Sequence, residues 1–200
     1  ISPGDWLNFT IALLCHDIGN VKGICKKDTN HQIASGINGE LIEFNTTGTD
    51  AVLYPYHIDR AKLFIKERFS GREFIDVSKI CEYIEMTRFP IPEDDFYSDT
   101  KNFHGLARAA DLIGQLGDPD HLRKMPALYF EFEEIGLNEK FGYNNPEDMR
   151  KKYAKFYWNE VSKYLIDAIQ YLRVTQEGKQ WISNLYSQVF SVEHYKSLLK

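Results

Sequence analysis

The sequence predicts an all-α fold with one small β-hairpin. Over most of the chain, apolar residues recur at the three- and four-residue steps of an amphipathic helix. Several polar residues followed by proline or by an acidic residue mark helix starts. Between residues 26 and 56 the helical period disappears, and Asn38-Gly39 separates two short runs, as in a tight hairpin.

The first helix is expected to begin at Pro3. Ser2 can serve as its N-cap, and Asp5, three residues on, completes a capping box. Apolar side chains on most sides predict that this helix is buried over much of its girth. Gly19 and Gly23 are expected to end or bend it.

The hairpin is predicted from residues 31–37 and 40–44, on either side of Asn38-Gly39. A structureless loop of about 30 residues would be unusual inside a compact domain. We therefore interpret this insert as a lid or as the wall of a site, where substrate selectivity would be built.

The rest of the chain has a helical pattern. Helices are expected at residues 57–69, 76–86, about 100–116 and 126–141, followed by one capped by Asn145 and one opened by Thr175. No linker or repeat separates them, so we expect one domain over residues 1–200. Because the chain begins with Ile1 rather than methionine, an N-terminal segment is expected to be missing.

The composition excludes several classes of protein and of binding partner. The chain is 43% hydrophobic, which excludes a disordered tail, and its net charge of −5 argues against bulk nucleic-acid binding. Its longest apolar stretch, Phe9–Cys15, is far short of the ~20 residues of a membrane helix. Three cysteines without metal or disulfide spacing favour a cytoplasmic protein. The aromatic residues of the C-terminal helices could be buried in a homodimer interface.

His16-Asp17 is the first pattern that indicates chemistry. The two residues follow Leu13 and Leu14 and precede Ile18 near the end of an apolar helix. An imidazole and a carboxylate are costly to bury there unless they are paired or bind a metal ion. A capped helix end or a salt bridge is the alternative interpretation.

A resemblance adds to this pattern. The string Leu-Leu-Cys-His-Asp-Ile-Gly at 13–19, with Tyr-His-Ile-Asp-Arg at 56–60 and Ala-Ala-Asp-Leu-Ile-Gly-Gln-Leu at 109–116, resembles the HD-domain metal-dependent phosphohydrolase superfamily. The similarity is greatest to a bacterial group within it, and residues 85–90 and 174–181 also look like that group. The resemblance thus spans nearly the whole chain and implies an HD-domain helical bundle.

The resemblance also implies a ligand set. His16, Asp17 and Asp111 would bind one or two divalent metal ions, and Asp17 could bridge two of them. His57 is a further metal ligand or the general acid, so Asp17 and His57 are the candidate catalytic residues; a structural histidine at a helix start is the alternative. Nitrogen and oxygen ligands without thiolate suit Mn, Fe, Co, Ni, Zn or Mg.

Other histidines are weaker candidates. His104 lies seven residues before Asp111, on nearly the same helix face, but a surface histidine is the favoured interpretation. The superfamily's first histidine has no counterpart in residues 1–15, so it either lies upstream or is lost. His31, His121 and His194 are expected to be surface histidines.

Phosphate-binding candidates complete the set. Lys22, Arg60 and Arg88 each lie close in sequence to a motif residue, and ordinary surface cations are the alternative. The resemblance implies hydrolysis of a small phosphoester, such as a nucleotide, by metal-activated water. The alternative is a degenerate HD-type module that binds a ligand or regulates without catalysis. A purely structural helical domain is disfavoured by the His-Asp pair and Asp111.

Overall fold

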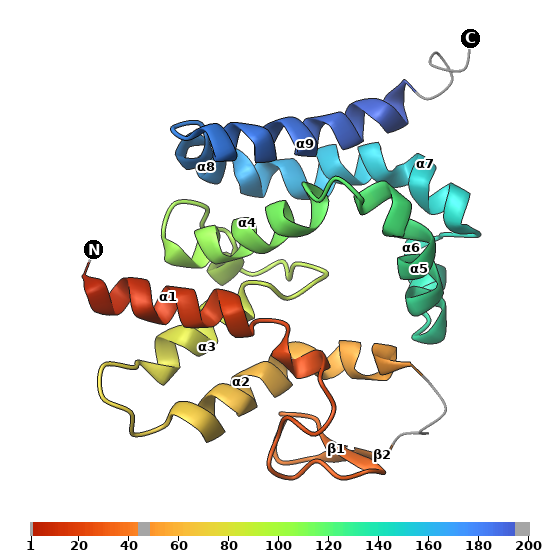
Figure 1. Cartoon of the computed structure of the whole chain (residues 1–200). Coiled ribbons are helices and arrows are strands. Elements are labelled where there is room, and N and C mark those ends of the chain that lie inside the picture. The colour runs from red at the N-terminus through yellow and green to blue at the C-terminus, as the bar shows by residue number, and fades with distance from the viewer. Residues whose placement is uncertain (1, 44–48, 195–200) are drawn as a thin grey trace. The chain divides into compact units, whose positions relative to one another are not determined.

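The computed structural model describes residues 2–43 and 49–194, and Figure 1 shows their arrangement. Its elements are helices and one two-stranded sheet, which confirms the predicted all-α class with a small β-hairpin. The chain divides into two compact units, residues 1–99 with 103–108 and residues 100–102 with 109–200. The single domain over residues 1–200 stays a prediction. Within the described ranges, no helix is long and apolar enough to cross a membrane.

The first unit is built on three helices, α1 (Pro3–Cys15), α2 (His57–Phe69) and α3 (Val77–Glu85), joined by the first turns of α4 (Phe103–Leu116). Both α1 and α2 pack against α3. Their core contains Phe9, Ala12, Ile58, Ala61, Ile65, Ile80, Cys81, Tyr83, Ile84 and Ala107. Short turns η1 (Ile18–Asn20), η2 (Asp50–Tyr56) and η3 (Asp95–Tyr97) connect the helices.

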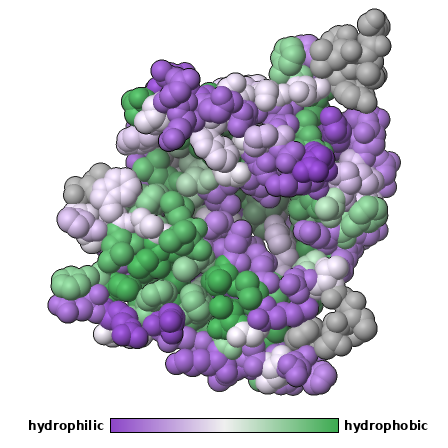
Figure 2. Space-filling model, viewed as in Figure 1, coloured by the Kyte–Doolittle hydropathy of each residue, from purple (hydrophilic) through white to green (hydrophobic). Residues whose placement is uncertain are grey.

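Helix α1 begins as predicted but is less buried than predicted. The Ser2 hydroxyl accepts the Asp5 amide (3.1 Å), and the Asp5 carboxylate accepts the Ser2 amide (2.9 Å), which completes the capping box. Only the side toward α3 is covered, so Leu7 is exposed and Leu14 is 78% exposed. Figure 2 shows apolar residues gathered over this helix.

The hairpin forms where it was predicted, with shorter strands. β1 (Gln32–Ala34) pairs antiparallel with β2 (Leu41–Glu43), with Ile33 opposite Ile42. Asn38 and Gly39 take the positive φ angles of the expected turn, +49° and +76°. Gly36 (φ +81°) follows the paired residues, and its backbone lies against that of Asp59 with no room for a Cβ. The predicted strand end at residue 44 lies outside the described residues.

Helices α2 and α3 follow the predicted bounds, and Asp76 caps α3 through the Lys79 amide (3.1 Å). Helix α4 begins at residue 103 instead of about 100. The Arg108 side chain donates to the carbonyl of Tyr97 (2.5 Å), the last residue of η3, and to that of Asp99 (2.8 Å), and a loop connects η3 to α4.

The second unit contains the remainder of α4, then α5 (His121–Glu134), α6 (Leu137–Phe141), α7 (Pro146–Phe156), a π-helical turn η4 (Tyr157–Val161), α8 (Ser162–Leu172) and α9 (Gln176–Glu193). Asn145 and Thr175 cap α7 and α9 as predicted. The prediction of a single helix at residues 126–141 is wrong. Helix α5 starts five residues earlier, contains Pro126, and is separated from α6 by Gly136 at φ +73°.

The histidine predictions are partly wrong. His31 and His194 are exposed, as expected. His121, expected at the surface, is only 7% exposed, and its ring centroid lies 5.0 Å from that of Tyr153. Burial lowers the pKa of its imidazole. The polar sequence around His121 indicated a surface position, whereas Tyr153, on α7, covers the ring.

Candidate functional site

His16 and Asp17 lie where α1 ends. His16 is the C-cap of α1, and Asp17 precedes η1. The His16 Nδ1 atom lies 2.8 Å from the Leu13 carbonyl oxygen, and its Nε2 atom lies 3.3 Å from Asp17 Oδ2. The adjacent residues are therefore in side-chain contact. This hydrogen bond from His16 lowers the pKa of the Asp17 carboxyl, and charges on His16 and His57 act in the same direction against the effect of burial.

His57 is the first residue of α2. It is 7% exposed, and its ring stacks on Tyr54 with centroids 5.0 Å apart. Its Nδ1 atom lies 2.5 Å from the Tyr54 carbonyl oxygen. Both His16 and His57 therefore engage a backbone carbonyl three residues earlier through Nδ1. Because a carbonyl oxygen can only accept, Nδ1 of each ring carries a proton; Nε2 of His57 is then the atom available for metal binding or proton transfer, whereas Nε2 of His16 faces Asp17.

Gly19 brings these two helix ends together. A Cβ on Gly19 would lie 1.9 Å from the His57 carbonyl oxygen and 2.9 Å from the Ala61 amide nitrogen. The backbone after Asp17 therefore lies directly against the first turn of α2, an approach that only glycine permits.

A carboxylate and imidazoles are donor types that divalent cations bind in proteins. In the described part of the chain, however, no group of three or more His, Cys, Asp or Glu side chains is placed to hold an ion. Asp111 lies on the part of α4 that belongs to the second unit. His104 Nε2 pairs with Glu82 (3.1 Å) at the surface of the first unit, in line with the favoured alternative.

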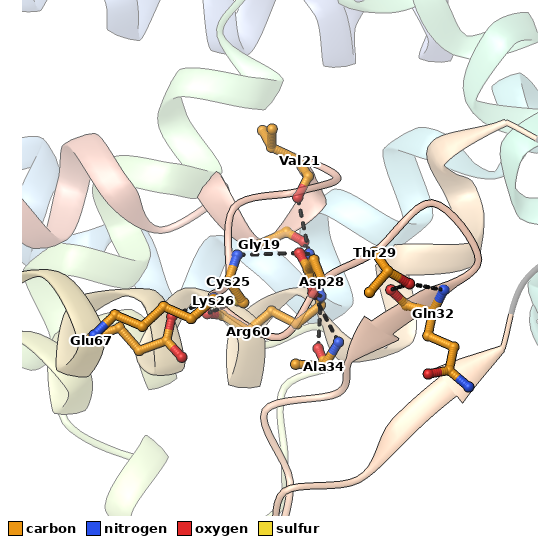
Figure 3. Close-up of polar contacts among 10 residues, drawn as sticks. All are labelled: Gly19, Val21, Cys25, Lys26, Asp28, Thr29, Gln32, Ala34, Arg60 and Glu67. Atoms are coloured by element: carbon orange, nitrogen blue, oxygen red, sulfur yellow. Dashed lines mark hydrogen bonds and ion pairs between the residues drawn. The ribbon is translucent and has the colours of Figure 1, made fainter.

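Arg60, a predicted phosphate ligand, is committed to the protein itself. Its side chain is fully buried, and all five of its N–H groups donate within the chain, as Figure 3 shows. The acceptors are the carbonyl oxygens of Gly19 (2.8 Å), Val21 (2.9 Å) and Ala34 (2.7 Å) and both carboxylate oxygens of Asp28 (3.1 and 2.9 Å). In this conformation Arg60 has no N–H left for a phosphate, so it is a structural residue.

The other two cations are paired but less enclosed. Lys22 Nζ lies 2.8 Å from Asp50 at the start of η2, and η2 packs against η1. Arg88 binds Glu85 and Asp59, the latter at 3.0 Å. Of the three predicted phosphate ligands, Lys22 is the one that follows η1 and pairs with η2, the turns next to Asp17 and His57, and whose side chain is partly exposed.

Asp28 is the residue that sequence reasoning missed. Its carboxylate accepts the amides of Cys25 (3.1 Å) and Ala34 (2.9 Å) besides the Arg60 guanidinium. Burial alone would raise the pKa of this carboxyl, but these hydrogen bonds outweigh it and lower the pKa. Asp28 lies in a loop without periodicity, and no local signal distinguishes it from the other acidic residues.

A family model described as Npun_R2479-like matches residues 1–195. The chain belongs to the Npun_R2479-like family. No curated protein and no solved structure matches it. Family membership therefore covers both compact units but does not connect the chain to the HD-domain superfamily or to a reaction.

Proposed function

We propose that this member of the Npun_R2479-like family is a metal-dependent phosphohydrolase that cleaves a small phosphoester, such as a nucleotide. The observation that carries the proposal is the placement of His16, Asp17 and His57 at adjoining ends of α1 and α2. Both imidazoles are oriented through Nδ1 by backbone carbonyls, and the lowered pKa of Asp17 keeps its carboxylate ionised at neutral pH. The sequence resemblance, rather than the geometry, assigns Asp111 to the same ion.

The roles follow from these contacts. A bound divalent ion supplies Lewis-acid activation of water and of the phosphoryl group. His16 and Asp17 would hold the ion through Nε2 and the carboxylate. His57, with its ring fixed through Nδ1 by the Tyr54 carbonyl, would use Nε2 either to bind the ion or to give a proton to the leaving oxygen.

Lys22 is the proposed contact to the phosphate. Its ion pair with Asp50 is partly exposed, so a phosphoester can replace that partner at little cost. The hairpin, which connects to α2 through the packing of Gly36 on Asp59, is the proposed source of substrate selectivity.

Elemental analysis of the purified full chain tests the proposal. After incubation with Mn²⁺, wild type should retain about one or two equivalents of metal per chain. Asp17→Asn and Asp111→Asn should lose most of that metal, whereas Asp120→Asn, which removes a surface carboxylate paired with Arg123, should not. Hydrolysis of p-nitrophenyl phosphate and of nucleoside monophosphates should follow metal content.

Wild type without bound metal would overturn the hydrolase proposal. Nucleotide binding that survives chelation by EDTA would then support the non-catalytic binding or regulatory module.

A further inference from the structure

The pair formed by Arg60 and Asp28 joins the two segments that carry the candidate site. Arg60 lies three residues after His57 on α2. Its guanidinium reaches the carbonyl oxygens of Gly19 (2.8 Å) and Val21 (2.9 Å), which follow Asp17 closely in the chain. One side chain thus connects the helix that begins with His57 to the segment that begins with Asp17 (Figure 3).

We propose that Arg60 is a positioning residue that, together with Asp28, sets the spacing between Asp17 and His57. The inference rests on the proposed function only for the roles given to those two residues. Asp28 orients the guanidinium with both carboxylate oxygens, and the guanidinium then fixes the backbone within η1, at Gly19, and directly after it, at Val21.

The geometry of the contacts requires arginine. The five N–H groups of a planar guanidinium meet five acceptor contacts at 2.7–3.1 Å, from three carbonyls and one carboxylate. A lysine at position 60 has three donors on a single nitrogen and cannot reach the carbonyls of Gly19, Val21 and Ala34 while it keeps Asp28.

The backbone of η1 that this pair holds lies directly against the start of α2. Gly19 lies against the His57 carbonyl with no space for a Cβ, so a small movement of η1 changes the distance between the two site segments. A buried ion pair is weak evidence for added stability and is better understood as specifying one chain path. Here the chain after Asp17, which forms η1, crosses the first turn of α2.

Arg60→Lys in the full chain tests the inference with two measurements. The first needs no metal: the nuclear Overhauser contact between the Gly19 α-protons and the Ala61 amide proton, which reports the close approach of η1 to α2. The second is Mn²⁺ affinity by calorimetry. We expect the helical circular dichroism to remain, the Overhauser contact to be lost, and the affinity to fall about 10- to 100-fold, as for groups that orient metal ligands.

Ile80→Val is the matched control. Ile80 is fully buried in the core of the same unit, on α3, so its substitution weakens that unit while it leaves the hydrogen-bonding groups of Arg60 and Asp28 unchanged. The Overhauser contact and the Mn²⁺ affinity should both stay at their wild-type values.

A folded Arg60→Lys chain that keeps both the Overhauser contact and the Mn²⁺ affinity would overturn the inference. If that variant does not fold, Asp28→Asn, which keeps the shape of the side chain, is measured in the same way. If neither folds, the pair serves stability alone and the positioning role is withdrawn. A wild type that binds no Mn²⁺ would defeat the proposed function, while the Overhauser measurement would still decide the role of Arg60.

Discussion

Two clusters of charged side chains are built on α2, and they differ in their partners. The side chains of Arg60 and Asp28 are fully buried, and the remaining partners of both are backbone carbonyls and amides. Lys62, two residues later and so on nearly the opposite side of the helix, binds Asp59 and Glu85. Arg88 binds the same two carboxylates, and the Tyr97 hydroxyl donates to Glu85, so this second cluster is built from contacts between side chains.

This difference separates two uses of charge. The Arg60–Asp28 pair accepts from or donates to backbone groups of Gly19, Val21, Cys25 and Ala34, so its loss leaves these backbone groups without that partner. The second cluster connects α2, α3 and η3 through side chains that keep roughly a fifth of their surface in water, for example 21% for Lys62 and 17% for Glu85. Water can replace a lost partner there at lower cost.

The largest effect is expected from Asp28→Ala. This change leaves the Arg60 charge buried without a counter-ion and two backbone amides without an acceptor, so it should lower the free energy of unfolding by about 3–5 kcal/mol. Urea denaturation followed by circular dichroism measures it. Asp50→Ala, which breaks the more exposed pair with Lys22, should cost less than about 1 kcal/mol. Equal costs for the two variants would remove the distinction between buried and exposed pairs.

A smaller effect, dependent on pH, is expected from Glu85→Gln. Burial by itself would raise the pKa of Glu85, but hydrogen bonds from Arg88, Lys62 and Tyr97 hold it at about 2 rather than near 4.5. The lowered pKa stabilises the fold above about pH 4.5, and this stabilisation is lost as the pH falls towards 2. We expect Glu85→Gln to cost about 2–3 kcal/mol at pH 7. The difference from wild type should shrink between pH 4.5 and 2 in urea titrations; a difference that is constant with pH would contradict the assignment.

The same contrast explains how far the sequence predicted the fold. The caps at Ser2, Asn145 and Thr175 and both ends of α2 were predicted correctly, because each depends on residues within one helical turn. The burial of His121 and the break at Gly136 were missed, because they depend on packing and on chain geometry that a periodic pattern does not record.

In the candidate site, too, contacts between sequence neighbours were predictable and contacts between distant residues were not. Adjacent residues made the contact between His16 and Asp17 predictable. Arg60 was expected to bind phosphate because it lies near a motif residue, whereas its acceptors are up to 41 residues away along the chain. Asp28 had no signal in the sequence, since two of its three partners, Arg60 and Ala34, come from α2 and from the end of β1. The metal and the reaction stay predictions.

The smallest effect is expected from Lys62→Met. Methionine fills about the same volume as the aliphatic part of the lysine side chain. Both carboxylate partners of Lys62 keep Arg88, and Glu85 also keeps the Tyr97 hydroxyl (2.8 Å). Because the remaining cation still neutralises part of the cluster and water reaches it, the cost should be about 1 kcal/mol or less. It should also decrease when urea denaturation is repeated at high salt, since ions screen a partly exposed pair. The Asp28→Ala cost should hardly change with salt, because that pair is closed to solvent. A Lys62→Met cost as large and as insensitive to salt as that of Asp28→Ala would show that both clusters of α2 hold the fold in the same way.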